Sequence, residues 1–202
     1  MIGEIVRESI QHLLLVCAAV GLATLGGVPG GIVLAHRPRA ERLVLGTAGV
    51  IQTIPSLALF GFLIPLAWIG GIGVRTALVA LTLYSLLPIL RNTVTGLRGV
   101  DPAVREAGRG LGMTARQLLA EVELPLAAPV IVAGLRTATV TAVGTATIAA
   151  AIGAGGLGVF IFRGVAMLDT PTILAGAVPA ALMALAADFA LARIERRLGP
   201  PR

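Results

Sequence analysis

The chain has 202 residues, of which 56% are hydrophobic and 13% charged, and its formal net charge of +6 comes from arginine because the sequence contains no lysine. A mean hydropathy of +0.94 is too high for a soluble domain of this length and predicts an integral membrane protein. Since apolar stretches alternate with arginine-containing gaps, we expect an all-α bundle. Nucleic acid is excluded as a partner, because the arginines lie at the ends of apolar segments, where they set membrane topology.

Five membrane spans are predicted, and together they make residues 1–202 a single membrane domain. They cover residues 10–35, 43–67, 75–97, 126–152 and 171–192. Most arginines fall on one side of these spans, so the positive-inside rule places the N-terminus outside and the C-terminus in the cytoplasm. Trp68, at the end of the second span, is predicted to be an anchor at the membrane interface.

The spans contain helix-loosening and close-packing residues. Pro55, Pro65, Pro88 and Pro179 are among the prolines within them. Such residues are tolerated in a membrane where neighbouring helices or a water-lined cavity satisfy the freed backbone groups. Two overlapping GxxxG pairs in residues 26–31 and an alanine face between Ala138 and Ala150 favour close helix packing. The sequence leaves open whether these faces pack within the chain or against another subunit.

The longest polar run, REAGRGLGMTARQLLAEVELP, covers residues 105–125 on the predicted cytoplasmic side. Asp101 followed by Pro102 is typical of a helix start, with the aspartate as N-cap. Gly112 is expected to end this first helix. Its apolar positions form one stripe, as in an amphipathic helix. The stripe is Val100, Ala103, Val104, Ala107 and Leu111.

A second amphipathic helix is predicted directly after the glycine. Thr114 and Gln117 fit a capping box at its start, and Leu124-Pro125 is expected to end it where the fourth span begins. Both helices are too short to span a bilayer. From the residues alone they can lie on the lipid surface, pack under their own bundle or dock onto a soluble partner.

One motif in this run resembles a known family. Glu106-Ala107-Gly108, three residues, Gly112, nine residues and Val122-Glu123-Leu124-Pro125 are similar to the EAA loop of ABC importer permeases, E-A-A-x3-G-x9-I-x-L-P. Gly108 replaces the second alanine, and Val122 replaces isoleucine. In that family the loop, here residues 98–125, is a coupling helix that docks in a cleft of the ATP-hydrolysing subunit. The resemblance implies coupling roles for Arg105, Glu106, Ala107, Gly108, Gly112, Leu118 and Pro125.

From about residue 50 onward the chain looks like the osmoprotectant branch of this family, whose members carry glycine betaine, choline, carnitine or proline. The matching strings are IQTIPSLALFGFLIPL, GLRTATVTAVGTATIAAAIGAGGLG and AGAVPAALMALAADFALARIERRL. The resemblance implies a non-catalytic, multi-pass subunit of the bacterial inner or plasma membrane. Its partners would be two ATPase subunits, a second permease copy or homologous permease, and an extracytoplasmic substrate-binding protein. ATP and magnesium would bind to the ATPase, so no cofactor or metal is expected in this chain.

Two alternatives remain open. Permeases for methionine and other small solutes share the loop and the size, so an amino acid is an alternative cargo. A secondary carrier or channel is the alternative of another class. It is disfavoured because such carriers usually place carboxylates or paired broken helices near the midplane, and Asp188 is the only carboxylate within the predicted spans.

Candidate residues for a translocation path or gate are Tyr84, Arg136, Thr139, Gly155, Gly156 and Asp188. Arg136 lies about 15 Å into the fourth span, where its charge needs a partner or water. Pairing with Asp188 and lining of the path both remain open for it. The string Gly153–Gly158 fits G-x-G-x-x-G, but it follows a membrane helix, so a flexible turn on the outer side is predicted instead of a dinucleotide site. The single tryptophan and single tyrosine are few for an aromatic cage around a quaternary ammonium, which predicts that an external binding protein recognises such a solute.

Overall fold

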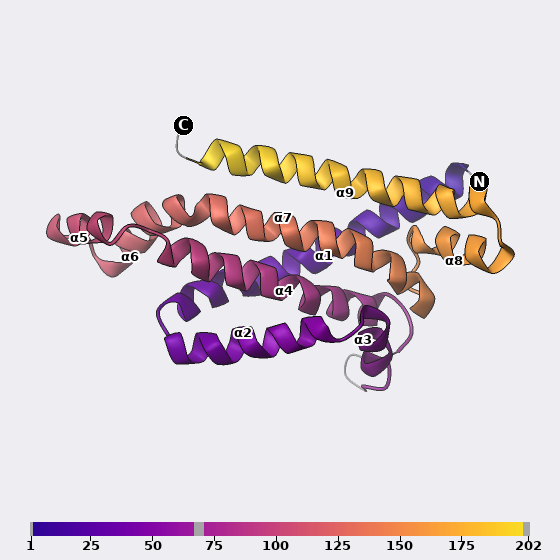
Figure 1. Cartoon of the computed structure of the whole chain (residues 1–202), viewed down its shortest axis with the longest axis horizontal. Helices are drawn as coiled ribbons and strands as arrows, with labels where there is room; N and C mark the ends of the chain where they lie inside the picture. The colour runs from indigo at the N-terminus through magenta and orange to yellow at the C-terminus, as the bar shows by residue number, and fades with distance from the viewer. Residues whose placement is uncertain (1, 67–70, 200–202) are drawn as a thin grey trace.

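The computed structural model describes residues 2–66 and 71–199, and these residues form helices and no strand (Figure 1). Four helices are long and apolar enough to cross a membrane: α1 (Ile2–Ala35), α4 (Val74–Arg98), the helix Ala115–Ile152 that contains α7 (Leu124–Ile148), and α9 (Thr170–Leu198). A bent pair, α2 (Pro38–Thr53) and α3 (Ser56–Leu63), makes a fifth span if it is counted as one. The predicted all-α membrane fold is confirmed. Trp68 lies outside the described residues.

The first helix is longer than predicted. α1 has 34 residues and is therefore about 51 Å long, which exceeds the roughly 30 Å hydrocarbon core of a bilayer. The residues before the predicted start of the first span at residue 10 belong to the same helix, and Pro29 lies inside it. α1 therefore extends beyond the apolar layer.

The second predicted span, residues 43–67, is sharply bent inside its apolar segment. α2 and α3 meet at an angle of 102° across a short break. Ile54 adopts an extended conformation with ψ 126, because a residue that precedes proline is sterically pushed out of the helical region. Pro55 then stands at the start of α3, so the second apolar segment folds as two helices.

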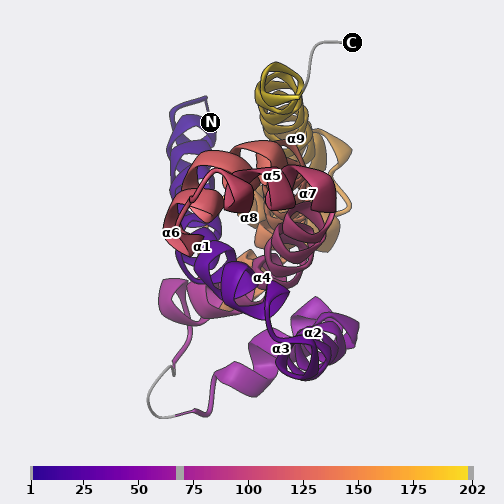
Figure 2. The same ribbon diagram turned by 90° about the vertical axis from the view of Figure 1, so that its left-hand side faces the viewer.

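The other helices pack around α4 and α7. α1 packs mainly on α4, α4 on α7, and α7 on α9, while α8 (Gly158–Met167) packs on α9. Figure 2 shows α2 and α9 at opposite sides of this arrangement. α1 begins at the end of the bundle where α8 lies, and α9 ends toward the end that carries α5 (Pro102–Gly110) and α6 (Ala115–Gln117), as Figure 1 shows.

One of the two GxxxG pairs packs within the chain. A Cβ atom built on Gly31 would lie 2.5 Å from Cβ of Thr93, and one built on Gly27 would lie 2.7 Å from Cγ2 of Ile89. These two glycines therefore let α1 approach α4 closely. A Cβ atom on Gly26, in contrast, meets nothing within 4 Å. On α7, the alanine face is also used inside the chain, since Ala138, Ala142 and Ala146 are buried.

Gly31→Val is expected to destabilise the protein, because the new side chain must push Thr93 and α4 away. Overpacking of this kind typically costs about 1–3 kcal/mol of unfolding free energy. Gly26→Val is the matched control, since it adds the same side chain to the same helix in open space. Thermal unfolding of both variants in detergent, followed by size-exclusion chromatography, measures the difference. Equal losses in the two variants would contradict the packing of Gly31 against α4.

Candidate functional site

The polar segment begins and turns as its sequence predicts. The N–H of Ala103 donates to Oδ1 of Asp101 at 2.8 Å, which makes Asp101 the N-cap of α5. At the other end, the N–H of Met113 donates to the carbonyl of Gly108 at 3.2 Å. Gly112 between them has φ +81, a conformation that glycine adopts without strain. The first half of the segment is therefore a capped helix followed by a glycine turn.

The second half differs from the prediction. The capping box is present, with Gln117 N–H donating to Oγ1 of Thr114 at 3.3 Å and Thr114 N–H donating to Oε1 of Gln117 at 2.9 Å. The prediction that Leu124-Pro125 ends this helix is wrong. A π-helical turn, η1 (Leu118–Glu123), carries the chain into α7 without a break. The wider π turn gives room for the ring of Pro125, which would otherwise crowd the preceding turn.

An ion pair and a close contact hold the loop against η1, near the start of this long helix. Nε of Arg105 lies 2.7 Å from Oε1 of the buried Glu123, and the same guanidinium donates to the carbonyl of Leu97. A Cβ atom on Gly108 would lie 2.7 Å from Cδ1 of the buried Leu118. These contacts fix α5 against η1, so the two parts of the loop are expected to move together.

The predicted apolar stripe lies on the outside of this chain except for Val100, which is buried. Ala103, Val104, Ala107 and Leu111 are exposed, and Leu111 is 84% exposed. Glu106 is exposed beside them. An apolar helix face next to a carboxylate, held rigidly from behind, is a surface that needs a partner to cover it. Of the predicted coupling residues, Glu106 and Ala107 lie on this outer face, whereas Arg105, Gly108 and Leu118 hold it in place.

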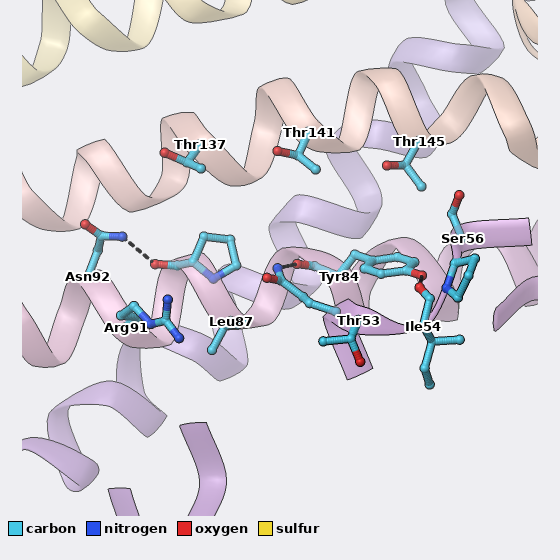
Figure 3. Close-up of a pocket in the computed structure, with 13 residues that line it drawn as sticks. Thr53, Ile54, Ser56, Tyr84, Leu87, Arg91, Asn92, Thr137, Thr141 and Thr145 are labelled. Carbon is cyan, nitrogen blue, oxygen red and sulfur yellow. Dashed lines mark hydrogen bonds between the residues drawn. The ribbon is translucent and has the colours of Figure 1, made fainter. Parts of the chain in front are cut away.

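A cavity of about 540 Å³ lies between the bent pair, α4 and α7 (Figure 3). Its polar lining includes Gln52, Tyr84, Asn92, Thr137, Thr141 and Thr145. Of these, the sequence singled out only Tyr84. The three threonines follow each other at intervals of four residues along α7, which places their side chains on one helix face. That spacing is visible in the sequence and was a signal for this polar face.

Tyr84 joins the bent pair to α4 through two backbone carbonyls, one freed by Pro88 and one at the break before Pro55. Pro88 has no N–H to bond the carbonyl four residues earlier, that of Tyr84. Nε2 of Gln52 donates to this carbonyl at 2.8 Å, and the hydroxyl of Tyr84 donates to the carbonyl of Ile54 at the break before Pro55. Each of the two carbonyls thus accepts a hydrogen bond from a side chain of the other element.

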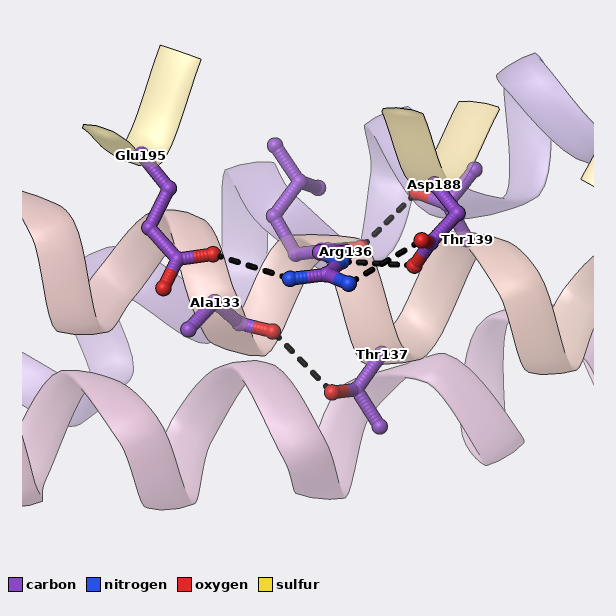
Figure 4. A network of polar contacts seen from close by, with 7 residues as sticks. Ala133, Arg136, Thr137, Thr139, Asp188 and Glu195 are labelled. Carbon is purple, nitrogen blue, oxygen red and sulfur yellow. Dashed lines mark hydrogen bonds and ion pairs between the residues drawn. The ribbon is translucent and has the colours of Figure 1, made fainter. Parts of the chain in front are cut away.

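Arg136 connects α7 to α9 (Figure 4). Its Nε and Nη2 atoms lie 2.6 and 3.0 Å from the two carboxylate oxygens of Asp188, and its Nη1 atom lies 3.3 Å from Oε2 of Glu195. The pairing with Asp188 is therefore present, and Glu195 is an additional partner that the sequence analysis missed. Asp188 and Glu195 are seven residues apart, which places both on one face of α9.

The Arg136 network also borders a cavity of about 320 Å³ that Asp188, Glu195, Thr137 and Thr141 line. Thr137 and Thr141 line the larger cavity as well. One threonine face of α7 therefore separates two polar hollows, and Arg136 both pairs with Asp188 and lines one of them. Thr139 donates to the carbonyl of Leu135 at 2.8 Å and lines neither cavity.

The remaining two candidates, Gly155 and Gly156, lie in a turn before α8 with φ +75 and +81. The N–H of Gly156 donates to Oε2 of Glu8 at 2.8 Å, and Nε2 of Gln11 donates to the carbonyl of Ala154 at 3.0 Å. The glycines are thus tied to α1 and do not line either polar cavity. A Cβ atom on Gly155 would lie 2.4 Å from Gln11, so the turn fits closely around that side chain.

These features define a multi-pass membrane transport subunit with polar hollows between its helices and a rigid loop that presents an uncovered face at one end. Residues 27–200 match the family described as the binding-protein-dependent transport system inner membrane component. The chain belongs to this family and is the permease subunit of an ABC importer. The membership predicted from the loop motif and the location in the inner membrane are confirmed.

Two relatives and one solved structure illustrate the likeness. The chain is 46% identical over 198 residues to the choline transport system permease protein OpuBB of Bacillus subtilis, covering 98% of this chain and 90% of the relative. It is 48% identical over 200 residues to the osmoprotectant import permease protein OsmW of Salmonella typhimurium, with 98% and 93% covered. An inward-facing structure of the MetNI methionine ABC transporter matches with a TM-score of 0.89 and 25% identity over 99% of this chain and 98% of that chain.

Tyr84→Phe is expected to lower the stability of the protein, because it leaves the carbonyl of Ile54 without its donor. Loss of a partner for a buried backbone group costs about 1–3 kcal/mol. Ser85→Ala is the matched control, since the buried Ser85 hydroxyl on the same helix has no hydrogen-bond partner among the described residues. Thermal unfolding in detergent should separate the two variants. A loss from Ser85→Ala as large as that from Tyr84→Phe would contradict the role of the tyrosine hydroxyl.

Proposed function

We propose that this permease forms the translocation path of an ATP-driven importer for a small compatible solute such as glycine betaine, choline or carnitine. This proposal rests on the sequence identity of 46% and 48%, over nearly the whole chain, to permeases named for choline and for osmoprotectants. A second permease copy or a homologous permease completes the path. Two ATPase subunits bind ATP and magnesium, and an extracytoplasmic binding protein delivers the solute.

The continuous helix of η1 and α7 couples the loop to the translocation path. The exposed face of α5, with Glu106, Ala107 and Leu111, docks in the ATPase on the cytoplasmic side. Arg105–Glu123 and Gly108–Leu118 transmit the movement of α5 to η1. Because η1 continues into α7 without a break, the same movement shifts the threonine face and thereby opens the path to one side of the membrane or the other.

Within the path, Thr137 and Thr141 offer hydroxyls to the passing solute, and Arg136 with Asp188 and Glu195 lines its side. Tyr84 contributes its aromatic ring to the lining. One ring does not make an aromatic cage for a quaternary ammonium. This chain therefore provides a passage of low affinity, and the selection of the solute belongs mainly to the binding protein.

The second candidate function is import of an amino acid by an ABC importer of the same kind. It is favoured by the likeness to the methionine transporter structure. Uptake of labelled choline, glycine betaine, carnitine and methionine by the reconstituted importer, with its ATPase and binding protein, distinguishes the two. Uptake of methionine alone would overturn the compatible-solute proposal. Uptake that persists without ATPase and ATP would overturn the ABC mechanism in favour of a secondary carrier or channel.

Glu106→Arg is expected to reduce ATP-dependent uptake at least about tenfold, since a charge reversal on the docking face opposes the contact that the wild-type carboxylate makes. Gly112→Pro is expected to have a similar effect, because proline cannot adopt the φ of +81 found at this turn. Glu121→Arg, the same charge change at an exposed position of η1, is the control. Uptake and ATP hydrolysis are measured in proteoliposomes with equal amounts of folded permease. Wild-type uptake in Glu106→Arg would remove the coupling role from this residue.

A further inference from the structure

A second groove of about 540 Å³ lies between the end of α1 and the polar loop, away from the cavities around the threonine face. Three arginines line it, Arg37, Arg109 and Arg116. Its apolar lining is Ile32, Val33, Met113, Leu118 and Leu119. Cationic groups around an apolar floor match the two parts of a phospholipid, a charged headgroup and an acyl chain.

The positive charge in this groove is not neutralised by the described part of the chain. No ion pair there involves Arg37, Arg109 or Arg116. The carboxylate that lines the groove, Glu123, is already bound by Arg105 at 2.7 Å. The guanidinium groups are exposed, and they are therefore available to an anion from outside the chain.

The position of the groove favours lipid over a soluble ligand. Val33 belongs to the outward face of α1, together with Leu14, Leu22 and Leu25, and these four side chains are exposed. Positions at intervals of three, four or eight residues share a helix face, so the groove continues the surface that α1 presents to the hydrocarbon. α1 ends at Ala35, and His36 and Arg37 follow, which is the change from apolar to basic residues expected at the headgroup level.

The groove also lies on the other side of α5 from the face assigned to the ATPase. Arg109 is four residues after Arg105, the residue that turns inward to Glu123, so the two share a helix face. Leu111 and Ala107 belong to the exposed apolar stripe. A ligand in the groove and an ATPase on the stripe can thus bind together.

We propose that this groove binds one anionic phospholipid of the cytoplasmic leaflet, with its phosphate among Arg37, Arg109 and Arg116 and its acyl chain along Val33 on α1. The proposal rests on the proposed function only for the orientation that puts the loop in the cytoplasm. Basic pockets beside membrane helices on that side suit anionic headgroups. A bound lipid here joins α1 to the loop and so makes the position of α5 depend on the membrane.

Binding of phosphatidylglycerol and phosphatidylcholine to the purified permease is to be compared by native mass spectrometry. We expect preference for phosphatidylglycerol in the wild type. The triple variant Arg37→Gln, Arg109→Gln, Arg116→Gln should bind it roughly 100-fold more weakly, since each arginine near a surface favours anionic lipid by about a factor of five. The control removes three arginines from α9 at the same end, with Arg193→Gln, Arg196→Gln and Arg197→Gln, and should leave the affinity within about twofold.

A second pair of variants tests whether the apolar lining of the groove holds the acyl chain. Val33→Trp fills the groove and should weaken the binding of phosphatidylglycerol, whereas Leu25→Trp, on the same exposed face outside the groove, should not. Equal binding by the triple variant and the wild type, or no preference for phosphatidylglycerol, would overturn the proposal. Competition by inorganic phosphate at the same concentration as the lipid would also overturn the proposal. Loss of the lipid when the ATPase binds would overturn it as well. None of these readouts involves solute or ATP, so their failure is distinct from failure of the importer function.

Discussion

The fold depends on one constraint, that backbone groups at membrane depth must find partners inside the protein. Pro88 frees the carbonyl of Tyr84, and the break before Pro55 frees that of Ile54. Gln52 and the hydroxyl of Tyr84 supply the missing donors in opposite directions between the bent pair and α4. The bend and the wall of the larger cavity are therefore one structure, because the bonds that permit the bend also place Tyr84 and Gln52 at the polar space.

The same constraint explains which parts of the fold could be predicted from the sequence. Local capping signals at Asp101, Gly112 and Thr114 were sufficient, since each is decided by atoms within a few residues. Proline was not. Pro88 stays inside a helix, whereas Pro55 follows a break, and the difference lies in which neighbouring side chains reach the freed carbonyls. Those neighbours are distant in the sequence, so the pattern around each proline could not decide its outcome.

The site was predictable to a similar extent. Charge at membrane depth identified Arg136 and Asp188, because such charges need partners wherever they occur. The threonine face was missed although its spacing is regular, since threonine in an apolar helix can satisfy its own hydroxyl by bonding the preceding turn, as Thr137 does with Ala133 at 3.0 Å. Only the packing of Ala138, Ala142 and Ala146 against the core leaves the adjacent, threonine-bearing face toward the outside of the chain.

That assignment bears on the assembly. Thr137 and Thr141 are exposed, and the side chain of Arg136 is 35% exposed, in a helix of a single permease chain. Hydrocarbon is a poor solvent for a partly exposed arginine and its carboxylate partners, so water or protein must cover this face. The groove along the threonine face of α7 is open on one side, so this chain alone cannot separate water in the groove from the surrounding lipid. A second polar-faced bundle, as we propose, would close the groove, and two such faces opposite each other would enclose an aqueous passage. The solvation of α7 thus supports the pairing of permeases that we propose, with the passage between them.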